Sequence, residues 1–210
     1  SGRQLGLRAD ITPQVARIEA HQLHEEAVSR LCYSGSVAHT LPEGLMSSRE
    51  PLLIGAELYG CASLAADAEI LILMAQSLAV LDLPHFYVDL DHIGIVRALL
   101  AESHLHALEE EALFVALQSK DLTSLRQIVL NLPSMLQQAW LALPHLYGGV
   151  EVLEQAAAVL PALPALQQAL LELTQLVAQL PASIKISIDL AENRVSHYHS
   201  GLVFAVYADG

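Results

Sequence analysis

A leucine-, alanine- and glutamine-rich segment interrupted by prolines runs from about residue 102 to residue 182, and it constrains the fold more than any other feature. The segment has almost no runs of β-branched residues, so strands are disfavoured there. A proline in a helix interior removes a hydrogen bond, and each proline therefore marks a helix boundary. In the last helix, leucines recur at helical spacing opposite glutamine and glutamate. We predict packed helices delimited by Pro133, Pro144, Pro161, Pro164 and Pro181.

Strand-like runs lie on both sides of this helical segment. LCYSGSV (31–37) and PLLIGAELYG (51–60) predict an antiparallel hairpin, because the loop between them is too long for a tight turn. Further strands are predicted at 86–90, 185–190 and 201–208, and helices at 13–28, 62–80 and about 96–101. In the first helix, Thr12 is placed as the N-cap and Pro13 as the first helical residue.

These elements predict an α+β fold with a helical insertion. The predicted divisions are a first core segment (1–101), the insertion (102–182) and the last core strands (183–210). The first residue is not methionine and the last residues follow a strand, so we expect flanking segments of a longer protein. Apolar surface should then be exposed.

Charge and cysteine content exclude several classes of protein. The net charge of −13, with ten lysine and arginine residues in no cluster, disfavours nucleic acid as a partner. The richest apolar run, ILILMAQSLAVL, contains Gln76 and Ser77, so no membrane span is predicted. Cys32 and Cys61 lack the spacing of a metal site or a disulfide framework, and we predict two reduced, buried thiols in a cytoplasmic protein.

Metal and cofactor motifs are not found. The chain has ten histidines, but neither His-x-His pair has a carboxylate directly beside it, and the pair His21 and His24 fits the solvated side of a helix. There is no phosphate-binding loop, dinucleotide fingerprint or Ser/His/Asp order. We therefore predict no cofactor, no metal and no catalytic residues.

Three charged residues lie in or next to predicted elements, where a buried charge would need a partner of opposite charge. Glu57 lies in a strand, on the same face as Leu53 and Gly55; Asp10 precedes a helix, and Arg194 precedes the last strand. If they converge, the carboxylates and the guanidinium could bind the ammonium and carboxylate of an amino acid. Each also has an ordinary explanation: Glu57 as a solvated strand residue, Asp10 as a capping or turn residue, and Arg194 as a surface turn residue.

Three motifs together resemble the histidyl-tRNA synthetases, which are class II aminoacyl-tRNA synthetases with an antiparallel sheet flanked by helices. LRADITPQVAR resembles the family's LRP(E/D)-x-T segment. The stretch RLCYSGSVAHTLPEGLMSSREPLLIGAELYG resembles class II motif two and ends in the G-x-E-x-x-G pattern as GAELYG. NRVSHYHSGLVFAVY resembles the histidine-recognition segment. The resemblance covers about residues 1–100 and 183–210.

The resemblance implies which residues contact histidine, with the carboxylates on its α-amino group and the Tyr/His pair near its imidazole. The implied contacts are Asp10, Thr12, Glu57, Arg194, Tyr198 and His199. The motif-two arginine that holds ATP is His39 here, which lacks the fixed charge and bidentate fork of a guanidinium. Losing one such preorganised donor costs roughly a hundred- to a thousandfold in rate. The family's glutamine becomes Leu53, its second recognition tyrosine His199, and the glutamate after Val-Phe becomes Ala205.

This combination of kept and lost residues resembles the regulatory subunits of ATP phosphoribosyltransferase, which are synthetase paralogues; RADITPQVARI and QSKDL add to the match. The resemblance implies a non-catalytic subunit in the first step of histidine biosynthesis. Its expected partners are a short-form catalytic subunit, histidine as feedback effector and a second copy in a dimer. Two alternatives stay open, a fragment of an active histidyl-tRNA synthetase and a scaffold with a vestigial pocket.

Overall fold

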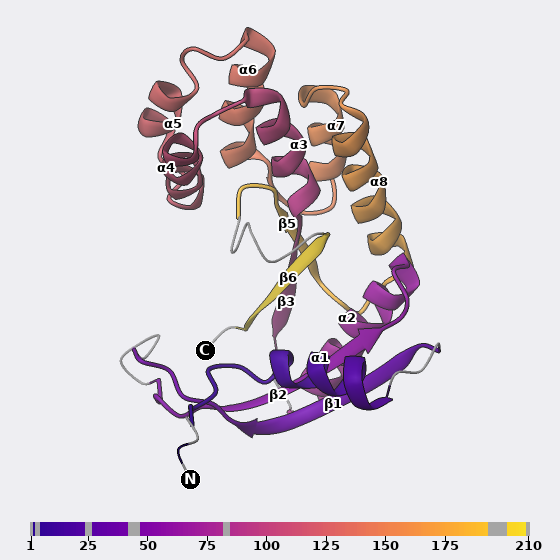
Figure 1. Ribbon diagram of the computed structural model, residues 1–210. Coiled ribbons are helices and arrows are strands. Elements are labelled where there is room, and N and C mark those ends of the chain that lie inside the picture. Colours follow the sequence, from indigo (N-terminus) through magenta and orange to yellow (C-terminus); the bar gives the residue numbers. More distant parts are fainter. Residues whose placement is uncertain are drawn as a thin grey trace. The chain divides into compact units, whose positions relative to one another are not determined.

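The computed structural model of the chain describes residues 2, 5–23, 27–41, 47–81, 85–192 and 201–208 (Figure 1). The chain divides into two compact units, Ser1–Ile70 and Leu71–Gly210. Their mixture of helices and sheets confirms the predicted α+β class. The division at 101/102 and 182/183 stays a prediction about the helical insertion.

The first unit is a β-hairpin covered by a short helix. Strands β1 (Ser29–Ser36) and β2 (Leu52–Tyr59) pair antiparallel from Ser29↔Tyr59 to Ser36↔Leu52, which confirms the predicted hairpin. Helix α1 (Thr12–Ile18) continues as the π-helical turn η1 (Glu19–Leu23). Ile11, Val15 and Val37 are buried and pack against the hairpin. Alternation along the strands therefore sets one face of the hairpin towards the helix.

The predicted start of the first helix is wrong by one residue. Ile11 is the N-cap and makes no side-chain cap bond, while Thr12 is the first helical residue and Pro13 the second. Asp10 does the capping instead, since its Oδ1 accepts from the N–H groups of Ile11 (2.6 Å) and Thr12 (3.3 Å). The regular α-helix also ends at Ile18, well before the predicted Val28; His21 is exposed in η1, and His24 lies outside the described residues.

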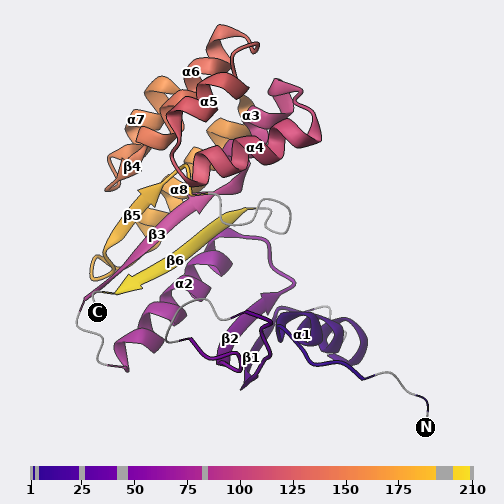
Figure 2. The ribbon, with the colours of Figure 1, turned by 90° about the vertical axis from the view of Figure 1, so that its left-hand side faces the viewer.

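The second unit contains a four-stranded mixed sheet of order β4-β5-β3-β6 (Figure 2). The strands are β3 (Phe86–His92), β4 (Tyr147–Gly148), β5 (Ile186–Asp189) and β6 (Leu202–Ala208). β3 pairs antiparallel with β6 but parallel with β5. The parallel pair is possible because a long helical crossover separates β3 from β5 in the chain.

Helices provide the rest of the structure, and the prolines delimit them as predicted. The helices are α2 (Leu64–Ala79), α3 (Ile93–Ser103), α4 (Ala107–Gln118), α5 (Leu122–Ile128), α6 (Ser134–Ala142), η2 (Leu143–His145), α7 (Val152–Val159) and α8 (Pro164–Gln179). Pro133 is the N-cap of α6, Pro144 lies in the 3₁₀ turn η2, Pro164 begins α8, and Pro161 and Pro181 follow the ends of α7 and α8.

Helix α8 shows why the proline-interrupted segment folds as packed helices. Leu166, Leu170, Leu173 and Leu176 are buried in one stripe, and α8 packs against α3, α7 and β3. The predicted leucine stripe is therefore confirmed. By contrast, the prediction of buried thiols is wrong: Cys32 and Cys61 are free and both are exposed. Cys32 lies on the outer face of the hairpin, where alternation puts it among exposed side chains.

Candidate functional site

The face of the hairpin that α1 covers, called here the inner face, presents Leu31 and Tyr33 of β1 and Leu53, Gly55, Glu57 and Tyr59 of β2. Leu31, Tyr33, Leu53 and Tyr59 pack against the buried side chains of Ile11, Val15 and Val37. The opposite face presents Leu52 and Ile54, which are exposed. The predicted alternation is therefore correct, and it places the Glu57 carboxylate on the inner face.

Glu57 has one carboxylate oxygen without a hydrogen bond. The Tyr59 hydroxyl donates to Oε2, whereas Oε1 is buried and has no partner among the described residues. A buried carboxylate oxygen without a donor is costly, and such atoms are rare in folded proteins. The arrangement therefore leaves one acceptor without a donor among the described residues, and a cationic donor such as an ammonium group suits a carboxylate best.

Tyr33 connects the start of α1 to this face. Its hydroxyl lies 3.3 Å from Thr12 Oγ1, within hydrogen-bond distance. The ring crosses the strand at Gly55, where an added Cβ would lie 2.3 Å from Tyr33 Cζ. A side chain at position 55 would therefore displace the tyrosine from Thr12. The structure thus places Thr12 above the same strand that carries Glu57.

Glycine is required at both ends of GAELYG, for different physical reasons. Gly55 leaves room for Tyr33, whereas Gly60 has a φ of +79°, in the left-handed region that favours glycine. An added Cβ at Gly60 would also lie 3.1 Å from the Ala27 carbonyl oxygen. A side-chain contact therefore requires glycine at the start of the motif and the backbone requires it at the end, with Glu57 between them.

Asp10 and Arg8 hold the segment before α1. Asp10 Oδ1 is occupied by the two backbone N–H groups at the helix start, while Oδ2 has no partner among the residues that the structure describes. Arg8 donates from Nε to the Ser36 carbonyl oxygen (2.9 Å) and from Nη1 to Gln14 Oε1 (3.0 Å). The guanidinium of Arg8 therefore fixes this segment against β1.

The sequence analysis missed Arg8, Tyr33 and Tyr59. The two tyrosines could have been found, because strand alternation and cross-strand register set them on the face of Glu57. Arg8 carries no such signal, since it lies in an irregular segment. Arg194, Tyr198 and His199 lie outside the described residues, so their role as histidine contacts stays a prediction, as does that of Asp10, Thr12 and Glu57.

Leu53 and His39 are the two positions near the hairpin that depart from the synthetase pattern. Leu53 packs into the apolar cluster of the inner face, where the family's glutamine would add a polar group. His39 is half-buried just beyond β1, and its backbone N–H donates to the Arg49 carbonyl oxygen (2.8 Å).

Buried carboxyl groups lie on one face of the second unit's sheet. Asp89 and Asp91 are both buried. Burial, reinforced by a hydrogen bond to Glu192, raises the pKa of Asp89 to about 6. Burial raises the pKa of Asp91 to about 8, against the lowering effect of the His92 N–H and with the charges of Asp189, Asp89 and Glu192 adding to the rise. Both groups hold a proton more readily in the folded state than in the unfolded chain.

Asp91→Asn is expected to remove a pH-dependent part of the stability. The folded pKa of Asp91 is raised, so its contribution to the free energy of unfolding is lost as the pH rises from about 4 to about 8. Asparagine keeps the oxygen that accepts from His92 (2.7 Å) but does not titrate. Wild type should therefore lose about 2 kcal/mol relative to the variant between about pH 5.5 and about pH 7.5. Urea unfolding of both proteins at both pH values measures this. If the difference in free energy of unfolding between wild type and variant is the same at the two pH values, the prediction is wrong.

The QSKDL motif joins the end of α4 to the sheet. Lys120 has a φ of +51° at the end of α4, where Lys120 N–H donates to the Leu117 carbonyl (3.0 Å) and Asp121 N–H to that of Ala116 (2.8 Å). Glycine usually holds this position. Here the lysine Nζ lies 2.6 Å from Asp189 Oδ2 and 4.2 Å from the ring centroid of Tyr147. These contacts account for lysine at a strained position.

A comparison with protein families decides the ancestry of the chain. The family model described as histidyl-tRNA synthetase matches residues 1–210. The chain belongs to the histidyl-tRNA synthetase family. This confirms the resemblance found in the three motifs. Among the described residues of this family member, no helix is long and apolar enough to cross a membrane, and no group of three or more metal-ligating side chains is formed.

Curated relatives of this family member share about half of its residues. The ATP phosphoribosyltransferase regulatory subunit of Cupriavidus metallidurans is 52% identical over 210 residues, which are 100% of this chain and 55% of the relative. The protein of the same name from Laribacter hongkongensis is 51% identical over 211 residues, 100% of this chain and 54% of that protein. The chain thus spans about half the length of the curated relatives it matches.

Solved structures confirm the class II synthetase-like fold of this family member. A structure from Bacillus halodurans C, described as an ATP phosphoribosyltransferase regulatory subunit/histidyl-tRNA synthetase, matches with a TM-score of 0.83 and 28% identity, over 96% of this chain and 54% of that chain. A chain of the ATP phosphoribosyl transferase (HisG:HisZ) complex from Thermotoga maritima matches with a TM-score of 0.73 and 19% identity, over 97% of this chain and 71% of that chain. The second likeness concerns the fold alone.

Proposed function

We propose that the chain is the synthetase-like core of a non-catalytic regulatory subunit of ATP phosphoribosyltransferase. Relatives of that name are about half identical to it over its full length, and they support the proposal. The subunit works in the cytoplasm with a short-form catalytic subunit that condenses ATP with phosphoribosyl pyrophosphate, the first step of histidine biosynthesis. It also self-associates as a dimer within the hetero-oligomer.

The effector of this subunit is histidine, and the observation that carries this part of the proposal is the buried Oε1 of Glu57, which has no hydrogen-bond partner among the described residues. An α-ammonium group is a cationic donor of the kind that a buried carboxylate oxygen lacks. Asp10 and Thr12 belong to the same site, and Arg194, Tyr198 and His199 complete it. This assignment rests on the family motifs together with the inner-face position of Glu57.

The site binds an amino acid without activating it. Activation of an amino acid by ATP requires stabilisation of charge on the phosphates, and a fixed guanidinium serves this better than an imidazole. His39 stands where the family has that arginine. Adenylate formation is therefore absent, and no residue of this chain is assigned a catalytic role.

The test uses the full-length protein and a short-form catalytic subunit. We expect the two to co-purify, the regulatory subunit to raise the rate of the condensation, and histidine to lower it. ATP–pyrophosphate exchange driven by histidine would instead identify an active synthetase. Co-purification without any histidine binding in calorimetry, by the free subunit or by the complex, would leave a scaffold with a vestigial pocket. Failure to co-purify would overturn the proposal.

A further inference from the structure

Helix α4 has two apolar faces, and only one of them is covered. Leu113, Ala116 and Leu117 are buried against the rest of the second unit. On another side, Leu108 and Val115 are exposed to 81% and 61%. With Ala112 they follow the i, i+4, i+7 spacing of a single stripe. A surface helix of a monomeric protein normally carries polar residues on its outward side, whereas this stripe is apolar and is not covered by the part of the chain that the structure describes.

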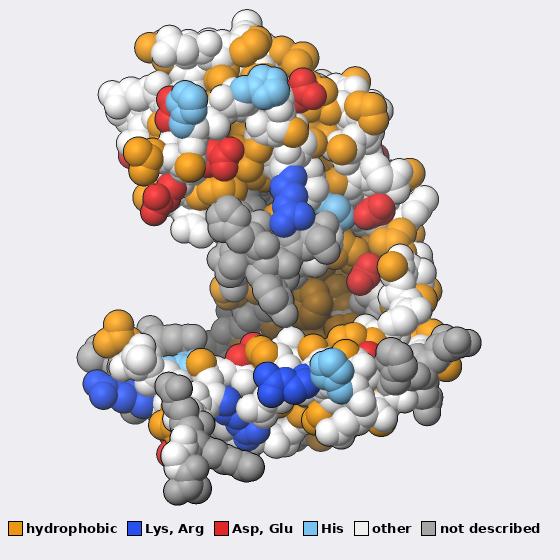
Figure 3. Space-filling model, in the orientation of Figure 1, with side chains coloured by type: hydrophobic (Ala, Val, Ile, Leu, Met, Phe, Trp, Pro, Cys, Tyr) orange, Lys and Arg blue, Asp and Glu red, His pale blue; other side chains and the backbone are white. Residues whose placement is uncertain are grey.

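The exposed stripe forms one wall of a groove between α4 and α5, called here the α4–α5 groove. Its volume is about 450 Å³, and its lining includes Leu108, Glu111, Val115, Asp121, Ser124 and Ile128. Figure 3 shows orange apolar and red acidic side chains gathered together over these helices. The stripe extends from Leu108 to Val115, about 10 Å along the helix axis, which suits two turns of a helix laid alongside it.

The charge of the α4–α5 groove is negative. Glu111 lies between Leu108 and Val115 and has no ion-pair partner among the described residues. Asp121 accepts hydrogen bonds from Ser124 and Thr123 at the start of α5, and these hold its pKa below its usual range, so the carboxylate is charged. From residue 102 to 182 the sequence has eight acidic and two basic side chains. A cationic partner is favoured.

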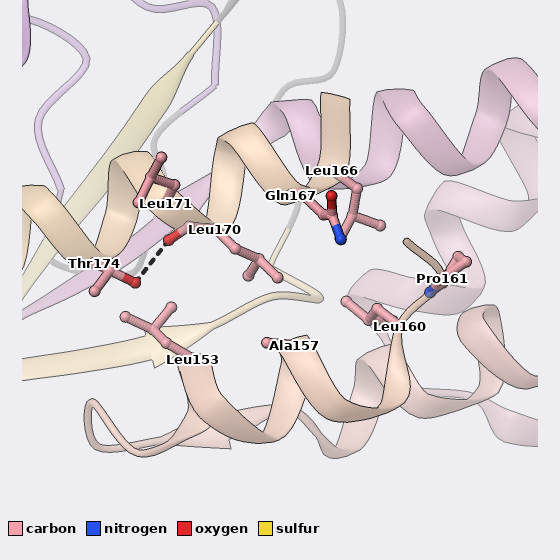
Figure 4. A pocket seen from close by; sticks show the side chains of 9 residues that line it. All are labelled: Leu153, Ala157, Leu160, Pro161, Leu166, Gln167, Leu170, Leu171 and Thr174. Atoms are coloured by element: carbon pink, nitrogen blue, oxygen red, sulfur yellow. Dashed lines mark hydrogen bonds between the residues drawn. The ribbon is translucent and has the colours of Figure 1, made fainter. Parts of the chain in front are cut away.

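Another cavity is better explained by internal packing. The space between α7 and α8, of about 280 Å³, is lined by Leu153, Leu160, Leu166 and Leu170, which are themselves buried (Figure 4). Thr174 at its edge donates its hydroxyl proton to the Leu170 carbonyl (2.8 Å), so it offers no free donor there. This space presents neither an exposed stripe nor a carboxylate. The α4–α5 groove has both.

We propose that the α4–α5 groove binds an amphipathic helix of the catalytic subunit, with apolar side chains against Leu108 and Val115 and a lysine or arginine against Glu111. The inference rests on the proposed function and names the surface that makes the subunit contact. The apolar stripe supplies area that is removed from water on binding, while Glu111 and Asp121 select a basic partner and fix its register.

Binding between the full-length protein and the full-length catalytic subunit tests this, measured by interferometry at low and at high salt. Leu108→Glu and Glu111→Lys each change an exposed side chain, and circular dichroism checks that they fold. We expect each to weaken assembly at least about tenfold, and wild-type affinity to fall with salt. Val159→Glu and Glu154→Lys place the same charges on exposed positions of α7 and should change affinity less than about twofold.

The outcomes separate this inference from the proposed function. If wild type binds the catalytic subunit and both groove variants bind it equally well, the groove is not the contact, although the proposed function stands. If wild type does not bind it at all, both proposals fail. If the groove variants instead lose self-association while they keep the catalytic subunit, a second copy of the chain occupies the groove and the inference is overturned.

Discussion

Replacing Glu57 by glutamine should weaken histidine binding by the full-length protein roughly 10- to 100-fold, which corresponds to the loss of one hydrogen bond to a charged group. Glutamine keeps an oxygen that can accept from the Tyr59 hydroxyl, as Oε2 does now. Its amide nitrogen, however, would take the place of Oε1. The ligand's ammonium group would then face a hydrogen-bond donor where it now faces an acceptor. The partner of the ammonium is lost while the shape of the side chain is kept. Titration calorimetry measures the change.

The same substitution should make the ligand-free protein more stable by about 1 kcal/mol, because it removes the charge of a buried carboxylate, one of whose oxygens has no donor among the described residues. Opposite changes in affinity and stability are a signature of a binding residue, since a residue that only supports the fold would lower both. Glu50→Gln, an exposed position in the same unit, is the matched control and should change neither. Unaltered histidine affinity in Glu57→Gln would exclude this carboxylate from the site.

Local patterns in the sequence predicted much of the fold. The alternation of LLIGAELY identified the face of Glu57, since a strand turns each successive side chain to the other side. Prolines predicted the helix boundaries because their effect on a helix is steric and does not depend on distant residues. Leucine spacing in α8 predicted its buried stripe because this spacing, too, is a local property of the sequence.

The features that the sequence did not predict depend on distant contacts or on a shift of one residue. β3 and β5 pair in parallel although about a hundred residues separate them, and no local pattern encodes that partner. Tyr33 reaches Thr12 only because Gly55 leaves space on the neighbouring strand. Thr12 and Asp10 are both good capping residues, so the sequence alone did not decide which of them holds the helix start.

Trp140→Ala should destabilise the second unit by about 4 kcal/mol, the largest effect on stability that we expect from one substitution. Trp140 in α6 is fully buried, and its Nε1–H donates to Ser103 Oγ of α3 (2.9 Å). The Ser103 hydroxyl in turn donates to the Leu99 carbonyl oxygen (2.7 Å). Alanine leaves a cavity and removes this hydrogen bond between α3 and α6. Urea unfolding followed by circular dichroism at 222 nm measures the loss.

Two further variants separate the volume of the indole from its hydrogen bond. Trp140→Phe keeps most of the volume and should cost only about 1 to 2 kcal/mol, because Ser103 Oγ loses a donor but keeps its bond to Leu99. Ser103→Ala leaves the buried indole N–H without an acceptor and should cost a similar amount. Leu130→Ala, at an exposed position of the same unit, should change stability by less than about 0.5 kcal/mol. If Trp140→Phe costs as much as Trp140→Ala, the hydrogen bond and not the packing of the indole holds α6 against α3.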